Sequence, residues 1–286
     1  MQVEERSDEL GELIAVGIVA VVAGTLGTML GLGGGVFLVP ILSLVFGVQL
    51  ETAVAASAIA VVANSASGSA NYLRARFTNV RLAMLMLVAT TAGAVIGGVV
   101  AIGLPEAALK GLFAGLLLFV AVVMYRRSFL SIASSVAIEL PDDPLRLGGR
   151  FQDPSVNAIV TYVPRNVRLG MPIASLGGVA SGMFGIGGGP ITVPLMTVLM
   201  QMPVKAAAST SSFMVGLTAS ASAFIYYANG FVNPRVTVAA VFGIVLGARL
   251  GVRVATRVRP QLLVSIFIVM LATLSILMAT DAIGLI

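Results

Sequence analysis

The chain has 286 residues, of which 58% are hydrophobic and only 10% are charged. A soluble domain carries about 25% charged residues, so this composition predicts a protein whose outer surface faces lipid. The sequence contains no cysteine, histidine or tryptophan, which excludes disulfides, thiolate or imidazole metal sites and catalysis by Cys or His. The net charge of +5 does not indicate nucleic-acid binding, because the basic residues lie between apolar segments without an aromatic patch.

Apolar runs follow one another along the chain on both sides of a polar stretch at 126–168. Most are close to the ~20 residues that a helix needs to cross a bilayer. The second run of each half is too short to cross and follows a glycine cluster, so we expect it to be half of a broken or re-entrant pair. The runs lie at 12–30, 35–47, 52–73, 82–102 and 107–125, and then at 169–186, 190–201, 206–228, 236–252 and 261–280.

The two halves match at a constant offset of 154 residues without a gap, which indicates a duplicated unit. Agreement extends beyond glycine, because Pro40 aligns with Pro194 and Asn79 with Asn233. We therefore expect an all-α polytopic membrane protein built from two helical repeats. The predicted organisation is an acidic N-terminal tail at 1–11, a first transmembrane repeat at 12–127, a cytoplasmic linker at 128–168 and a second transmembrane repeat at 169–286.

The positive charges predict that the two repeats are inserted with opposite orientation. Arg74, Arg76 and Arg81 surround the loop after the third run of the first half, which is predicted to be cytoplasmic. In the second half the basic residues follow the fourth run instead, at Arg253 and beyond. An odd number of segments per repeat produces this inversion. We expect a multi-pass protein of the cell (plasma) membrane, with the linker in the cytoplasm and both termini outside.

The linker contains turn-forming Pro, Asp and Gly residues, and the segments 145–151 and 158–163 have some strand character. A small cytoplasmic β-hairpin is one interpretation of this pattern, and an irregular loop is the other.

A glycine run followed by proline occurs once in each half, at Gly31–Pro40 and Gly185–Pro194. Three consecutive glycines do not hold a membrane helix straight, and a break is tolerated where the freed backbone faces protein or a wet cavity. The helix that restarts points its N–H groups and its dipole into that space, which favours an anion. Inverted repeats would bring the two breaks face to face near the midplane. The alternative is that these glycines only allow close helix crossing.

The third run of each half carries polar residues on one face. Ser57, Asn64 and Asn71 recur at a spacing of seven, and Ser211, Thr218 and Ser222 lie on the matching face of the second copy. Their hydroxyls and amides can donate hydrogen bonds to an oxyanion, or they can bond neighbouring helices together. The predicted substrate-binding residues are Gly33, Gly34, Gly35, Ser57, Asn64, Gly187, Gly188, Gly189, Pro190, Thr210, Ser211 and Ser212, with Gly31, Pro40, Gly185 and Pro194 as structural hinges.

The acidic residues all lie at the termini, in loops or in the linker, so no carboxylate is expected in mid-membrane. This distribution argues against a proton relay or a cation site, and it favours an anionic or neutral substrate. An intramembrane enzyme is also disfavoured, because a serine without a neighbouring base is a poor nucleophile. We expect no catalytic residue, no metal and no cofactor. Arg249 lies inside an apolar run, where it either attracts an anion or extends to the membrane surface.

These paired motifs resemble those of the sulfite exporter TauE/SafE family, also called the 4-toluenesulfonate uptake permease family. The family shows G-x-G-G-G-x4-P early in each half, here Gly31–Pro40 and Gly185–Pro194. Its A-x-G-T-S element is degraded here to 53–57 and 207–211. The resemblance covers about 24–125 and 178–279. It implies transport of sulfur-containing anions such as sulfite and organosulfonates.

The expected function is therefore a membrane transporter, with export as the expected direction, that moves small sulfur-containing oxyanions by alternating access. The substrate would be held at the two facing glycine-rich breaks. Two alternatives stay open: an anion channel or facilitator, and a carrier of another small anion or metabolite. The expected partners are this anion and the lipid bilayer, and the sequence leaves the oligomeric state, the coupling ion and the exact substrate open.

Overall fold

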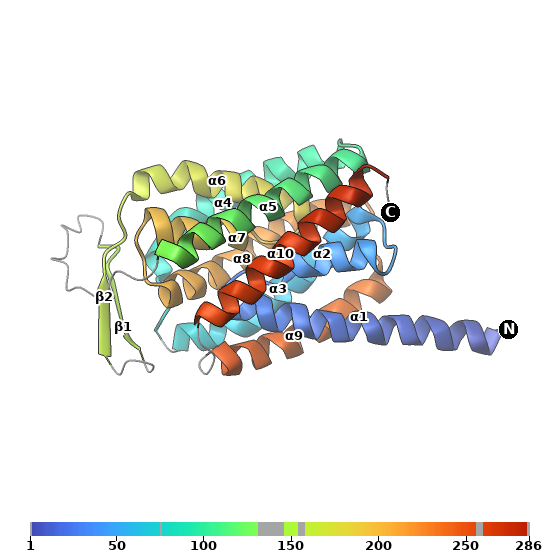
Figure 1. The fold of residues 1–286 in the computed structure, drawn as a ribbon, viewed down its shortest axis with the longest axis horizontal. Helices are drawn as coiled ribbons and strands as arrows, with labels where there is room; N and C mark the ends of the chain where they lie inside the picture. Colours follow the sequence, from blue (N-terminus) through green and yellow to red (C-terminus); the bar gives the residue numbers. More distant parts are fainter. Residues whose placement is uncertain (1, 75, 131–145, 154–157, 256–259, 285–286) are drawn as a thin grey trace.

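The computed structural model describes residues 2–74, 76–130, 146–153, 158–255 and 260–284. It is a bundle of α-helices with a small hairpin at one end and both chain termini at the other (Figure 1). We call these ends the hairpin end and the termini end. The linker segments 131–145 and 154–157 lie outside the described residues.

The two repeats contain corresponding helices, and the predicted apolar runs coincide with them. The first repeat comprises α1 (Gln2–Leu30), α2 (Gly35–Leu44), α3 (Leu50–Arg74), α4 (Val80–Ile102) and α5 (Glu106–Leu130). The second comprises α6 (Val167–Phe184), α7 (Gly189–Pro194) with the π-helical turn η1 (Leu195–Leu199), α8 (Val204–Ala228), α9 (Pro234–Ala255) and α10 (Pro260–Ala282).

The acidic segment that we expected to be a tail is part of α1, which begins at Gln2 and runs into the apolar segment without a break. Glu, Gln, Arg and Leu are good helix formers, and no proline interrupts them before the apolar run.

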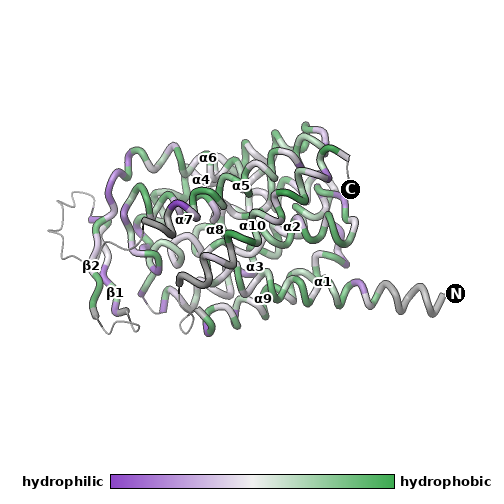
Figure 2. Tube along the Cα trace, in the orientation of Figure 1, coloured by the Kyte–Doolittle hydropathy of each residue, from purple (hydrophilic) through white to green (hydrophobic). Residues whose placement is uncertain are grey.

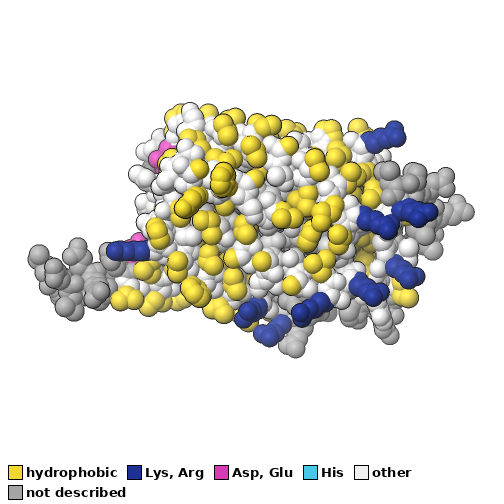
Figure 3. Space-filling view, turned by 180° about the vertical axis from the view of Figure 1, so that it is seen from behind, with side chains coloured by type: hydrophobic (Ala, Val, Ile, Leu, Met, Phe, Trp, Pro, Cys, Tyr) yellow, Lys and Arg dark blue, Asp and Glu magenta, His cyan; other side chains and the backbone are white. Residues whose placement is uncertain are grey.

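The outer surface of the bundle is apolar, as a lipid-facing surface requires. Within the described residues, five helical segments are long and apolar enough to cross a membrane: Leu10–Leu30, Leu50–Arg74, Val80–Ile102, Glu106–Arg126 and Pro234–Val254. Outward-facing Val88, Phe224 and Phe242 are 73%, 71% and 71% exposed, and hydrophobic side chains spread over the face seen in Figure 3. Hydrophobic residues follow the helices, whereas hydrophilic residues gather near the hairpin end (Figure 2). The chain is therefore a multi-pass membrane protein.

The repeats interlock, because the first helix of each packs along the fourth helix of the other: α1 on α9, and α6 on α4. Glycines allow the close approach at these crossings. A Cβ added at Gly24 would lie 2.5 Å from the carbonyl oxygen of Ile244, and one added at Gly251 would lie 2.6 Å from that of Thr25. Tight crossing by small residues thus occurs at these glycines of the long helices. Glycines of the two motifs also allow close approach, since a Cβ added at Gly31 would lie 2.5 Å from the carbonyl oxygen of Ala208.

The second helix of each repeat is a short re-entrant segment, as the run lengths predicted. α1 starts at the termini end, and α2 leads back toward the same end, where α3 begins (Figure 1). α6 starts at the hairpin end, and α7 with η1 leads back toward that end, where α8 begins. The two re-entrant pairs therefore enter the bundle from opposite ends, which is the arrangement of an inverted repeat.

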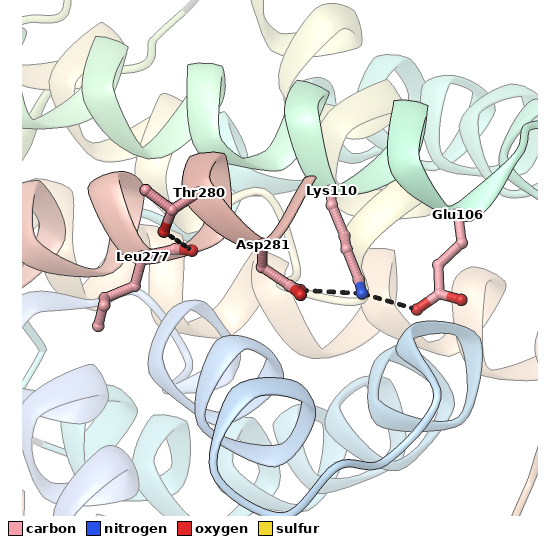
Figure 4. Close-up of polar contacts among 5 residues, drawn as sticks. All are labelled: Glu106, Lys110, Leu277, Thr280 and Asp281. Carbon is pink, nitrogen blue, oxygen red and sulfur yellow. Dashed lines mark hydrogen bonds and ion pairs between the residues drawn. The ribbon is translucent and has the colours of Figure 1, made fainter. Parts of the chain in front are cut away.

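An ion-pair cluster joins α5 to α10 at the termini end (Figure 4). Lys110 Nζ lies 3.0 Å from a carboxylate oxygen of Glu106, one turn earlier on α5, and 2.8 Å from one of Asp281 near the end of α10. The lysine and Asp281 side chains are only 17% and 19% exposed, so the charge of this lysine is neutralised where it enters the bundle.

The linker forms a β-hairpin, which decides between the two interpretations of its sequence. β1 (Gly149–Asp153) pairs antiparallel with β2 (Ala158–Tyr162), with Gly149 opposite Tyr162. The hairpin docks on the bundle through buried Phe151 and Tyr162, and the Phe151 ring lies edge-on to Phe77, 5.1 Å between centroids. Burial raises the pKa of the Tyr162 hydroxyl, and a hydrogen bond from Asn79 partly offsets this effect.

Asn79 fastens the hairpin to the bundle. Its side-chain oxygen caps α4 by accepting from the N–H of Leu82 (3.1 Å), and its amide nitrogen donates to the carbonyl of Leu147 (2.7 Å) in the linker. Its own N–H donates to Thr210 Oγ1 on α8 (3.0 Å). One buried residue therefore connects the linker, α4 and α8.

We expect Asn79→Ala to lower the free energy of unfolding by about 2–3 kcal/mol, because it removes a cap and a buried hydrogen bond. Asn233→Ala is the matched control, since Asn233 occupies the equivalent position and caps α9 in an exposed setting; about 1 kcal/mol is expected there. Thermal unfolding in detergent measures both. Equal losses in the two variants would contradict the role of Asn79 in docking the hairpin.

Candidate functional site

Both predicted helix breaks are present, and backbone conformation explains why they need glycine. Gly33 and Gly34 have φ angles of +77° and +84°, and α2 starts immediately after them. Gly187 and Gly188 have φ angles of +75° and +76°, and α7 starts after them. Side chains disfavour this left-handed region by about 1–2 kcal/mol per residue, so the glycine runs set the break points directly.

The two breaks touch each other in the centre of the bundle. A Cβ added at Gly189 would lie 2.7 Å from the Cα of Leu32 and 2.9 Å from the carbonyl oxygen of Gly31. A Cβ added at Gly35 would lie 3.0 Å from the carbonyl oxygen of Gly185. The motifs that are 154 residues apart in sequence thus form one central structure, which we call the paired break (residues 31–35 and 185–189).

Two valines at equivalent positions, Val61 of α3 and Val215 of α8, fill the space beside the paired break. A Cβ added at Gly33 would lie 2.6 Å from Val215 Cγ1 and 2.9 Å from Val61 Cγ1, and Gly187 approaches the same two side chains. Both valines are at most 1% exposed. The paired break is therefore packed against both valines. A separate hollow of about 580 Å³ lies at the termini end and is lined by Thr52 and residues 230–235.

Two serines bind the paired break through reciprocal hydrogen bonds between the repeats. Ser57 Oγ of the first repeat donates to the carbonyl oxygen of Gly185 in the second (3.1 Å). Ser211 Oγ of the second repeat donates to the carbonyl oxygen of Gly31 in the first (2.9 Å). These serines are equivalent in the duplication, as are the two glycines. Both predicted serines therefore lie at the breaks, and each one holds the opposite repeat.

A second hydroxyl extends this contact on one side only. Thr192 Oγ1 lies 2.9 Å from Ser211 Oγ and 3.1 Å from the carbonyl oxygen of Gly188, to which it can donate. Since Ser211 donates its proton to Gly31, Thr192 can donate its own proton either to Ser211 or to Gly188. The equivalent position in the first repeat is Leu38, so the duplication is not symmetric here. Sequence reasoning missed Thr192, although it is the first residue with a hydroxyl after the glycine run 187–189.

The other predicted polar residues lie farther from the paired break. Asn64 is 3% exposed and accepts a hydrogen bond from Thr28 of α1 (2.9 Å), next to the first break. Thr210 instead accepts from Asn79 in the α3–α4 loop. The backbone carbonyl of Ser212 accepts from Ser65 at 2.5 Å, while the hydroxyl of Ser212 is buried without a partner among the described residues.

Part of the predicted polar stripe joins helices, as the alternative interpretation proposed. Thr218 Oγ1 lies 3.1 Å from Thr90 Oγ1 of α4, and Ser222 donates to the carbonyl of Ser181 on α6 (3.2 Å). The side chain of Asn71 lies outside the described part of the chain. The stripe therefore combines residues at the breaks with residues that only connect helices.

The two prolines predicted as hinges, Pro40 and Pro194, do not lie at the breaks. Pro40 and Pro194 lie inside α2 and at the end of α7, and Pro190 occupies the first turn of α7, where its missing N–H costs little. Arg249 is exposed on α9, which fits an arginine extending toward the surface.

The centre offers neutral hydrogen-bond donors only. In α2 the N–H groups of Gly35 and Val36 come before the first N–H that bonds to Gly34, and in α7 that of Gly189 comes before the first that bonds to Gly188. N–H groups at these positions have no partner within their own helix. Serine and threonine hydroxyls surround them, and in the described chain no group of three or more acidic residues could hold a metal ion. This arrangement can contact an anion through dipoles and hydrogen bonds.

Comparison with known proteins gives a family and one similar protein. The family model described as Sulfite exporter TauE/SafE matches residues 16–278. The chain is also similar to the Probable membrane transporter protein YunE of Bacillus subtilis (strain 168), with 25% identity over 240 residues, which cover 79% of this chain and 82% of that protein. No solved structure matches the chain. The match spans both repeats and the paired break, and the chain therefore belongs to the TauE/SafE family of membrane transporters.

Proposed function

We propose that the protein carries small sulfur-containing oxyanions, such as sulfite or organosulfonates, across the cell membrane by alternating access. The observation that carries the proposal is the reciprocal pair of hydrogen bonds, Ser57 to Gly185 and Ser211 to Gly31, which joins the breaks of two inverted repeats. A substrate that inserts between these breaks would contact both repeats at once, so relative motion of the repeats would change its access.

An oxyanion suits this centre because its oxygens accept hydrogen bonds from several donors at once. Helix-start N–H groups and hydroxyls supply such donors without a positive charge that would hold the anion too tightly. Polar or charged groups within membranes commonly mark transport routes, and the described spans carry no carboxylate at this depth that would repel an anion.

Closure by Val61 and Val215 gives the proposed mechanism a gate. Both valines are buried and lie against Gly33 and Gly187, which supports this role. Rocking of the α3–α8 contact would withdraw one or both side chains and open a route to one membrane side at a time.

We infer that the hairpin end faces the cytoplasm and the termini face outward. Lys and Arg side chains gather toward the hairpin end (Figure 3), and the positive-inside rule assigns such an end to the cytoplasm. Export is the proposed direction, in keeping with the family description.

Flux of labelled sulfite and of a panel of organosulfonates into proteoliposomes tests the proposal. Saturable, salt-resistant uptake with competition among the oxyanions is expected from a carrier. Currents that follow voltage without saturating would point to a channel instead. Protein-free liposomes and proteoliposomes with Gly187→Ala serve as controls for leak.

A further inference from the structure

The two breaks differ in their contact with the helix that precedes them. At Gly27 of α1, an added Cβ would overlap the backbone nitrogen of Gly34 and lie 2.9 Å from the carbonyl carbon of Gly33. The equivalent position in α6 is Ser181, which carries a side chain. A Cβ added at Gly188 would lie 3.6 Å from the Cβ of Ser181. The second break thus stands farther from its helix, and the hydroxymethyl group of Ser181 occupies the space between them.

The hydroxyl of Ser181 has no hydrogen-bond partner within the described residues, although the residue is 0% exposed. Helical hydroxyls elsewhere in this protein bond to the carbonyl four residues earlier, as Thr25 does with Val21 and Ser220 with Gly216. An unpaired buried hydroxyl is costly. Within the described residues Thr78, Ser212 and Thr237 also have one, but it is the Cβ of Ser181 that lies against Gly188 of the paired break. A glycine or alanine at position 181 would avoid the cost.

We propose that Ser181 Oγ donates a hydrogen bond to the bound oxyanion, which lies between the two breaks and closer to the second. This inference rests on the proposed transport function and specifies which atoms contact the substrate. Thr192, one turn into the re-entrant segment, supplies a neighbouring hydroxyl that is already within reach of Ser211 and Gly188.

Asymmetry between the repeats supports this position for the anion. The positions equivalent to Ser181 and Thr192 in the first repeat are Gly27 and Leu38, which offer no hydroxyl. The first break is also pressed directly onto α1 at Gly27, so it leaves no room for an oxygen atom of a ligand there. The hydroxyl donors therefore favour the second break.

The test compares Ser181→Ala with wild-type protein in the proteoliposome flux assay, with sulfite and an organosulfonate as probes. We expect the variant to raise KM about ten-fold, the effect of one lost buried hydrogen bond to a charged group. Its Tm without substrate is expected to stay equal or to rise, because the removed hydroxyl had no partner. Ser209→Ala is the matched control: Ser209 is buried on α8 and bonds to Ala206 of its own helix (3.0 Å), so its KM is expected to stay unchanged.

Each outcome bears on the inference. A KM equal to that of wild type, or a fall in the substrate-free Tm of Ser181→Ala, would overturn the role of Ser181 while leaving transport intact. Lack of flux in wild-type protein for every oxyanion would overturn the proposed function, and this inference with it. A raised KM with an unchanged or raised Tm would support both.

Discussion

Gly187→Ala is expected to abolish transport and to lower the free energy of unfolding by about 2–5 kcal/mol. Gly187 has a φ of +75°, which costs an alanine about 1–2 kcal/mol. Its new Cβ would also overlap Val215 Cγ1 and lie 3.0 Å from the Val215 carbonyl oxygen, which adds overpacking of about 1–3 kcal/mol. Thermal unfolding in detergent and flux in proteoliposomes measure the two effects.

A matched glycine separates backbone strain from crowding. Gly230 has a φ of +78°, and an added Cβ there would meet no atom within 4 Å. Gly230→Ala is therefore expected to cost about 1–2 kcal/mol and to leave transport in place. Adding Val215→Ala to Gly187→Ala removes the clashing methyl group and is expected to recover part of the lost stability. If Gly187→Ala and Gly230→Ala behave alike, the tight contact between the second break and Val215 does not exist in the membrane.

Ser211→Ala is expected to lower kcat/KM about 10- to 100-fold, and Ser57→Ala by less. Both serines donate to a carbonyl of the opposite repeat, but Ser211 also contacts Thr192. Removing it leaves two buried polar groups short of a partner, whereas removing Ser57 affects Gly185 alone. The measurement is initial flux against substrate concentration for each variant.

The contact between Ser211 and Thr192 makes a further comparison possible. Ser211→Ala and Thr192→Val remove opposite ends of one hydrogen bond, so the effect of the double variant is expected to be smaller than the sum of the single effects. Ser57 bonds to Gly185, whereas Thr192 contacts Gly188 and Ser211, so Ser57→Ala and Thr192→Val are expected to be more nearly additive. Additivity in both pairs would show that Ser211 and Thr192 do not interact.

Features that depend on local sequence were predictable. Consecutive glycines at 33–35 and 187–189 demand backbone angles that a straight helix lacks, so the breaks and their re-entrant helices follow from the sequence. Run lengths and the constant offset between the halves likewise predicted the helices and the duplication, whereas the turn residues of the linker left a hairpin and an irregular loop open. The helix over the acidic segment 1–11 was not predicted, because acidic residues indicate a polar segment but do not show where a helix begins.

Features that depend on which helices meet were not predictable. Val61 and Val215 resemble any other apolar residue of α3 and α8, and only the crossing of these helices brings both against the breaks. Thr210 belongs to the same polar cluster in sequence as Ser211, but the helical turn between neighbours directs it to Asn79 instead. Ser181 and Thr192 could not be selected from the sequence, because their roles depend on how differently the two breaks pack in the folded bundle.

The docked linker adds a second asymmetry between the ends of the bundle. At the hairpin end, Leu147, Phe151 and Tyr162 cover Asn79. At the termini end, the equivalent Asn233 lines the open hollow beside Thr52. The bundle is therefore covered by the linker at one end and hollowed at the other.

Cysteine labelling at the gate tests the central claim most directly, because the chain has no native cysteine. V61C and V215C, each nearly isosteric, place single thiols against the paired break, and V88C provides a lipid-facing control that is 73% exposed in the bundle. We expect a small charged thiol reagent to modify V61C and V215C, to block flux, and to react more slowly when a saturating organosulfonate is present; sulfite is left out of this assay because it consumes thiol reagents. Saturable flux in variants whose thiols react at a rate independent of substrate would place the anion elsewhere and contradict the account.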